Sequence, residues 1–189
     1  MTVMSAMSHA YGLESALPPV IYTYVGLEEF DGREDRWQAL SAHSSARQRY
    51  ALIVDSGAED NVSGSYFLER FIVEVLKPKE LDQLLRYTDT HASFYGIGDN
   101  HQQATTKALV PIGVGGDVTA FETTILEGEQ SQYVPALLGL KSLTKRRATL
   151  HLDPDIPLME VDDASRNRVI ITLVLHAGHI LMPIDEFDV

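Results

Sequence analysis

The stretch ALIVDSGA, residues 51–58, decides the fold. Residues 50–54 form a short, almost wholly apolar run, which is typical of a strand buried on both faces. The strand stops at Asp55-Ser56-Gly57, where glycine permits a tight turn and close approach of another backbone. The sequence therefore predicts a rigid strand that delivers the carboxylate of Asp55 onto a turn. Asp and Gly commonly end strands, so the triplet alone is a weak signal.

Outward from this stretch the pattern is mostly β. Apolar and β-branched runs between turn signals predict strands at Val20–Val25, Tyr50–Val54, Ala92–Ile97, Ala108–Val114, Thr119–Leu126, Val134–Leu138, Thr149–Leu152, Val169–Leu175 and Ile180–Pro183. Helical spacing predicts short helices over Phe67–Leu76, from Pro78 onward and over Leu140–Arg147. We expect an all-β fold with a few short helices. Residues 1–48 form an N-terminal extension with one strand, 49–153 the main domain, and 154–189 a C-terminal β extension that packs on it.

The composition excludes several classes of function. The formal net charge is −12, with 27 acidic residues against 15 lysines and arginines, whereas nucleic acids and anionic membranes bind basic surfaces. The chain has no cysteine, which excludes disulfides, thiolate zinc sites and cysteine nucleophiles. No apolar run approaches the roughly 18–20 residues of a membrane span, and no secretory signal precedes Leu17. We expect a soluble cytoplasmic protein that binds neither nucleic acid nor membrane.

Three motifs, in this order, resemble the retropepsin family: the aspartic proteases of retroviruses and retrotransposons, and the protease domain of the DNA-damage-inducible ubiquitin-shuttle proteins. Residues 51–58 match the family's apolar strand and Asp-Ser/Thr-Gly-Ala. Tyr95-Gly96-Ile97-Gly98 matches its glycine-containing flap hairpin, and Leu137-Leu138-Gly139 matches the two apolar residues and glycine that open a short helix. The likeness covers roughly residues 49–153. The wider pattern is more similar to retroelement polyproteins of protists than to the viral enzymes.

The resemblance implies a closed β-barrel, equivalent to one lobe of an acid protease, that works as a homodimer. The implied activity is that of an aspartic endopeptidase with no metal or cofactor, acting on extended peptides and processing a retroelement polyprotein. Such hydrolysis needs two carboxylates that share one proton. Because the chain contains Asp-Ser-Gly once, the dyad would take one Asp55 from each subunit.

The resemblance also implies roles for individual residues. Asp55 is the catalytic residue, and Ser56, Gly57 and Gly139 support its loop, with Ser56 bonding across the dimer axis. The implied substrate contacts are Ala58, Glu59, Val62 and Leu137, together with the flap residues Gly96, Ile97 and Gly98.

One departure concerns the residue after Gly139. Viral enzymes carry an arginine there, which pairs with an acid just beyond the triplet. Leu140 stands at this position, so the sequence predicts that Glu59 has no obvious partner. The segment from Asn61 to Ser93 is also longer, and both chain ends exceed the minimal viral domain, which puts the mode of dimerisation in doubt.

Alternative interpretations remain open. The same fold can serve as a catalytically silent dimerisation or binding module, or an unrelated β-sandwich can carry the triplet by chance. His176 and His179 have a spacing that suggests a metal pair, but no third ligand is evident, so surface or core histidines are favoured. The glycines of residues 113–116 do not fit the spacing of phosphate or dinucleotide loops, and no Gly-x-Ser-x-Gly occurs.

Overall fold

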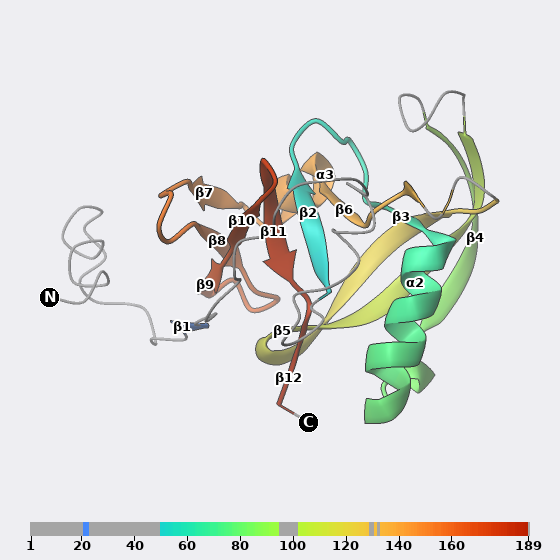
Figure 1. The fold of residues 1–189 in the computed structure, drawn as a ribbon, viewed down its shortest axis with the longest axis horizontal. Coiled ribbons are helices and arrows are strands. Elements are labelled where there is room, and N and C mark those ends of the chain that lie inside the picture. The colour runs from blue at the N-terminus through green and yellow to red at the C-terminus, as the bar shows by residue number, and fades with distance from the viewer. Residues whose placement is uncertain (1–20, 23–49, 95–101, 129–130, 132, 189) are drawn as a thin grey trace, which may run out of the picture.

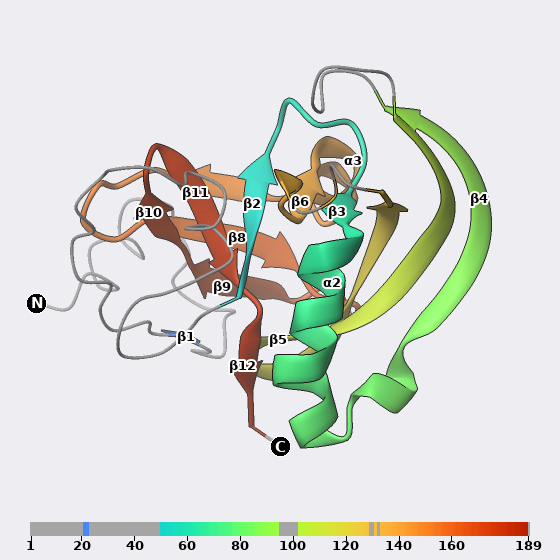
Figure 2. The same ribbon diagram turned by 45° about the vertical axis from the view of Figure 1, so that its right-hand side comes forward.

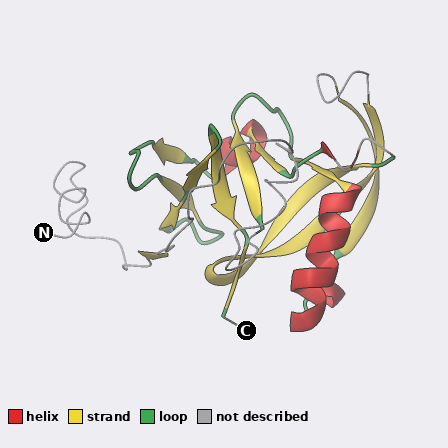
Figure 3. Cartoon of the chain, viewed as in Figure 1, coloured by secondary structure: helices red, strands yellow, loops and turns green. Residues whose placement is uncertain are grey.

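The computed structural model describes residues 21–22, 50–94, 102–128, 131 and 133–188, which are mostly β-structure with few helices (Figure 3). The strands are β1 (Ile21–Tyr22), β2 (Ala51–Asp55), β3 (Val62–Gly64), β4 (Arg86–Phe94), β5 (Gln102–Leu126), β6 (Leu137–Gly139), β7 (Thr149–His151), β8 (Leu158–Asp162), β9 (Arg168–Thr172), β10 (Val174–His176), β11 (His179–Pro183) and β12 (Asp185–Phe187). The helical elements are α2 (Ser65–Phe71), the π-helical segment Ile72–Leu76, the 3₁₀ turns Lys77–Lys79 and Asp82–Leu84, and α3 (Leu140–Lys145).

The described strands form two sheets (Figure 1). The larger has eight strands in the order β10-β11-β2-β6-β3-β5-β12, with β4 added beside β5, and the smaller has four in the order β1-β9-β8-β7. The expectation of a closed barrel is wrong for the described residues. In place of a continuous ladder of hydrogen bonds around a barrel, the C-terminal segment contacts the larger sheet at two separate strands. β11 pairs with β2, and after Ile184 the next strand, β12, pairs with β5.

The glycine-rich turn after Val114 lies inside β5, where the strand folds back on itself at Gly115 and Gly116 (Figure 1). Both glycines have positive φ, 59° and 94°, as a tight type I′ hairpin turn requires. Lys107 and Glu122 face each other from the two limbs, with 3.5 Å between Nζ and Oε1. β4 pairs with the first limb, and the two curve together along one side of the molecule (Figure 2).

The core lies between the two sheets and α2. One cluster of buried side chains joins Leu52 of β2 and Phe71 of α2 to Met159 of β8 and Ile171 of β9. Tyr50, just before β2, packs its ring on Phe71 with 5.2 Å between ring centroids. Full burial of one such side chain stabilises the fold by ~1.5–3 kcal/mol, so the smaller sheet and the helix hold β2 through the face that carries Leu52. Ile53, on the other face, packs with Leu181 of β11 in a separate cluster.

The segment after residue 154 takes part in both sheets. β8 and β9 lie in the smaller sheet, and β10, β11 and β12 lie in the larger one. Within the described residues, no helix is both long and apolar enough to cross a membrane.

Candidate active site

Asp55 is the last residue of β2, and the three residues before it are buried in the core. Its Oδ1 accepts hydrogen bonds from the backbone N–H groups of Gly57 (2.8 Å) and Ala58 (3.2 Å). A Cβ on Gly57 would lie 3.1 Å from the same oxygen, which leaves little room for a side chain. One carboxylate oxygen is therefore anchored by its own turn. We call residues 55–60 the Asp55 loop.

β6 runs parallel to β2 and brings the Leu-Leu-Gly motif beside this loop. The register pairs Ile53 with Leu137 and Asp55 with Gly139. A Cβ on Gly139 would lie 2.5 Å from the carbonyl oxygen of Asp60. Since that is closer than real Cβ contacts come, glycine at this position is what permits the loop to lie on β6. Two motifs that are 84 positions apart in the sequence, counting from 55 to 139, thus meet at one point.

The first turn of α3 forms hydrogen bonds with the backbone of the Asp55 loop. The backbone N–H of Leu140 donates to the carbonyl oxygen of Ala58 (2.7 Å), and that of Lys141 donates to the carbonyl oxygen of Glu59 (3.0 Å). The first N–H groups of a helix have no partner within the helix, so the loop supplies acceptors that these groups need. Loop and helix therefore stabilise each other.

Asn61 is a further part of this arrangement that the sequence analysis assigned no role. Its side-chain Nδ2 donates to the carbonyl oxygen of Glu122 on β5 (2.7 Å), and its Oδ1 accepts from the backbone N–H of Gly139 (2.8 Å). An amide carries both a donor and an acceptor, so one side chain joins the Asp55 loop, β6 and β5. The position of an amide directly after the acidic residues of the loop was the available signal.

The prediction that Glu59 has no obvious partner is wrong. Lys141, one position after the expected cation, places its Nζ 2.9 Å from Glu59 Oε1 and 2.9 Å from Asp60 Oδ2. The hydrogen bonds to Asp60 and then to Glu59 raise the pKa of Lys141 above its ordinary value. The prediction failed because α3 begins directly at Leu140, and its first turn presents the second residue to the loop instead of the first. The three groups are exposed, so this contact stabilises the fold little.

A cavity of about 960 Å³ opens beside Asp55. Of the residues predicted for the site, it is lined by Asp55, Gly57, Ala58, Glu59, Val62 and Leu137. Ser56 is exposed on the Asp55 loop and is not among the lining residues, whereas Gly139 is buried beneath the loop. The flap residues Gly96, Ile97 and Gly98 lie outside the described residues, but Phe94 and Gln102, on either side of them, line the cavity.

The cavity also includes residues that the sequence analysis did not select for the site. Tyr133, Val134 and Pro135, which precede β6, line it from one side, and Gly178 and His179 line it at the turn between β10 and β11. No local motif marks these positions, since they reach the cavity through the pairing of distant strands.

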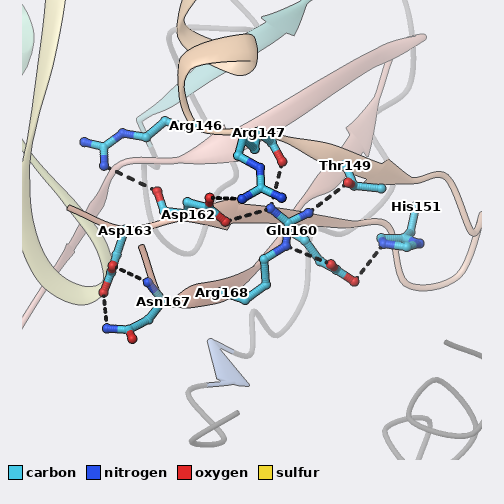
Figure 4. A network of polar contacts seen from close by, with 9 residues as sticks. All are labelled: Arg146, Arg147, Thr149, His151, Glu160, Asp162, Asp163, Asn167 and Arg168. Carbon is cyan, nitrogen blue, oxygen red and sulfur yellow. Dashed lines mark hydrogen bonds and ion pairs between the residues drawn. The ribbon is translucent and has the colours of Figure 1, made fainter. Parts of the chain in front are cut away.

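A second group of charged side chains lies on β7, β8 and β9 (Figure 4). Arg168 is at its centre: its guanidinium contacts Glu160 Oε2 (3.2 Å), Asp162 Oδ1 (3.0 Å) and Thr149 Oγ1 (2.9 Å). His151 meets the other carboxylate oxygen of Glu160 at 3.0 Å. Each carboxylate here has a charged or polar partner and the cavity lies elsewhere, so we interpret this group as a support of the smaller sheet. In the described part of the chain no group of three or more histidines and acids could hold a metal ion.

No protein-family model matches the chain, and no curated protein matches it. A carboxylate held at the end of a buried strand can act as a general base toward a water molecule. Glu59 and Asp60 also line the cavity but are engaged by Lys141. Glu127 is the fourth acidic residue of the lining and lies outside the Asp55 loop.

Proposed function

We propose that this protein is an aspartic endopeptidase of the retropepsin type. It acts as a homodimer in which each subunit contributes one Asp55 to the catalytic dyad. The observation that carries the proposal is the meeting of Asp55 with Leu137-Leu138-Gly139 on paired strands beside a cavity of about 960 Å³. These are two independent observations: the motifs resemble that family, and they lie in contact. The motifs are far apart in the sequence, so the first observation does not by itself produce the second.

The reaction requires one proton shared by two carboxylates about 3 Å apart. The ionised carboxylate removes a proton from a water molecule, whose oxygen attacks the scissile carbonyl carbon. The protonated carboxylate gives its proton to the carbonyl oxygen, which forms a tetrahedral diol. The first carboxylic acid then protonates the amide nitrogen, and the second carboxylate takes back a proton from one hydroxyl of the diol as the C–N bond breaks. The products are a carboxylic acid and an amine, and the dyad again holds one proton. No metal or cofactor takes part in this scheme.

Support for the dimer comes from the exposure of Ser56 and Gly57 at the tip of the Asp55 loop. An isologous twofold interface over this tip would bring two copies of Asp55 face to face. Substrate would lie extended in the cavity, with the flap closing over it and apolar contacts from Val62 and Leu137. The resemblance makes a retroelement polyprotein the candidate substrate.

The test compares wild type with Asp55→Asn on an unstructured protein substrate near pH 5, where a shared proton is favoured. The amide keeps an oxygen able to accept from Gly57, so the loop is expected to survive. We expect cleavage by the wild-type dimer and a loss of roughly a thousandfold or more in the variant. Light scattering under the same conditions reports the mass of each sample.

Inhibition by pepstatin would support the assignment. Cleavage that persists in Asp55→Asn would overturn the proposed role of the residue. A folded wild-type dimer without cleavage would favour the catalytically silent binding module, because dimerisation by itself does not separate the two functions.

A further inference from the structure

His179 is the first residue of β11, the strand that pairs with β2, and Asp55 is the last residue of β2. The antiparallel pairing of β11 with β2 matches Leu181 with Ile53 and Met182 with Leu52. Continued by two residues, the same register sets His179 opposite Asp55, each at the end of its strand. Residues directly opposite in an antiparallel pair project to the same face, with Cβ atoms roughly 4.5–5.5 Å apart.

Asp55 and His179 both line the cavity. β10 extends the row by one more strand, because His176 pairs with His179. A carboxylate and two imidazoles therefore follow one another across β2, β11 and β10. The row begins at the carboxylate that would activate the attacking water molecule.

The charges around the cavity make His179 distinctive. Among the described residues that line the cavity, four are acidic: Asp55, Glu59, Asp60 and Glu127. His179 is the sole basic residue among them. Glu59 and Asp60 are paired with Lys141, so their charge is already offset on that side. When both of its ring nitrogens carry a proton, His179 presents a cationic donor to a peptide group that approaches β11.

We propose that His179 is a specificity-determining residue of this cleft, and that it selects peptides with an acidic side chain within two residues of the scissile bond. This inference rests on the proposed function, because it assigns a substrate class to the same site. A carboxylate on the substrate accepts a charge-assisted hydrogen bond from the imidazole, whereas a lysine at that place meets like charge. Because His179 and Asp55 line the same cavity, we expect the effect at side chains that flank the cleaved bond.

The experiment uses matched peptides that differ in one residue, Glu, Gln or Lys, placed in turn at each position from the second before to the second after the cleaved bond. At pH 5 we expect wild type to prefer Glu over Gln at one of these positions by about tenfold in kcat/KM. His179→Gln should remove that preference, and His179→Lys should retain it because the cation is kept. His91→Gln is the matched control, since His91 is exposed on β4 and does not line the cavity.

A binding experiment distinguishes a failure of this inference from a failure of the proposed protease activity. Asp55→Asn and the double variant Asp55→Asn/His179→Gln are titrated with the Glu and Gln peptides by calorimetry. Cleavage by wild type with an unchanged Glu preference in His179→Gln would overturn the inference and leave the protease. Glu-selective binding that depends on His179, without any cleavage by wild type, would overturn the protease and leave His179 as the selecting residue. Absence of both cleavage and binding would contradict both proposals.

Discussion

Gly139 supports the site by lacking a side chain. The Asp55 loop crosses β6 so closely that a Cβ on Gly139 would lie 2.5 Å from the carbonyl oxygen of Asp60 and 2.6 Å from its carbon. Both are backbone atoms, and the loop is fixed at two further points by Asn61 and by the first turn of α3. A side chain here has no flexible neighbour to displace, so the whole loop has to move.

We therefore expect Gly139→Ala to lower the free energy of unfolding by about 3 kcal/mol and to reduce cleavage as Asp55 shifts. Urea unfolding and peptide hydrolysis measure the two effects. Gly128→Ala is the control: its Cβ would meet no atom within 4 Å, and only the positive φ of 95° opposes it, at a cost of about 1 kcal/mol. Equal losses in the two variants would contradict the close approach at Gly139.

At the scale of elements, α2 and its π-helical extension are tied to the start of β2 by Tyr50. The ring is 2% exposed and packs edge-on against Phe67, with 5.7 Å between centroids. The hydroxyl donates to Glu74 Oε2 at 2.5 Å. Burial, and next the hydrogen bond to Glu74, raise the pKa of Tyr50 above its ordinary value. The neutral phenol is thus part of the contact between helix and sheet.

This raised pKa has a defined consequence for stability. The contribution of Tyr50 is fully present below the ordinary tyrosine pKa of about 10 and is lost as the pH rises toward the folded-state value. We expect Tyr50→Phe to lose about 1 kcal/mol at pH 8, for the missing hydrogen bond, and to show a smaller further loss than wild type between pH 10 and 11. Urea midpoints at these pH values measure the difference. Tyr133→Phe removes an exposed hydroxyl and should follow wild type; a Tyr50→Phe curve parallel to wild type would contradict the argument.

Elements that depend on local pattern were predictable from the sequence. β2, α2 and α3 follow from an apolar run, helical spacing and a glycine boundary, and the turn at Gly115-Gly116 follows from glycine chemistry. Short strands such as β3 and β12 carry too few residues for a period to show. β8 lies in a stretch that mixes apolar and acidic residues, and it was missed too.

The candidate site divides in the same way. Asp55 and the Leu-Leu-Gly motif could be selected from the sequence because each motif consists of consecutive residues. The strands that carry them, β2 and β6, pair. Lys141 was missed because its role depends on where α3 begins. His179 reaches the cavity only through the pairing of β11 with β2, which joins residues about 130 positions apart in the chain. Strand pairing over such distances leaves no periodic trace in one sequence.

For the whole molecule, the shared core joins the described residues between 50 and 188 into one packing unit. Met182 and Ile184, near the C-terminus, belong to the same buried cluster as Tyr50 and Leu52. The backbone N–H of Ile184 also donates to the carbonyl oxygen of Tyr50 at 2.9 Å. The strand that carries Asp55 is therefore held by the last strands of the chain, and the site depends on both ends of this unit.

The dependence on a second copy can be tested by mixing. Each active dimer needs two copies of Asp55, so a subunit of Asp55→Asn that exchanges into a dimer silences its wild-type partner. With equal amounts of the two proteins and random exchange, about one quarter of the dimers are active, and activity per wild-type subunit falls to about half. An enzyme that works as a monomer would keep its activity per wild-type subunit unchanged. The measurement is the cleavage rate at fixed wild-type concentration as Asp55→Asn is added, near pH 5 and at moderate salt, which reduces repulsion between two chains of formal charge −12. A second Asp55→Asn preparation that also carries Gly139→Ala is the control, since a subunit with a displaced loop should exchange poorly and inhibit less.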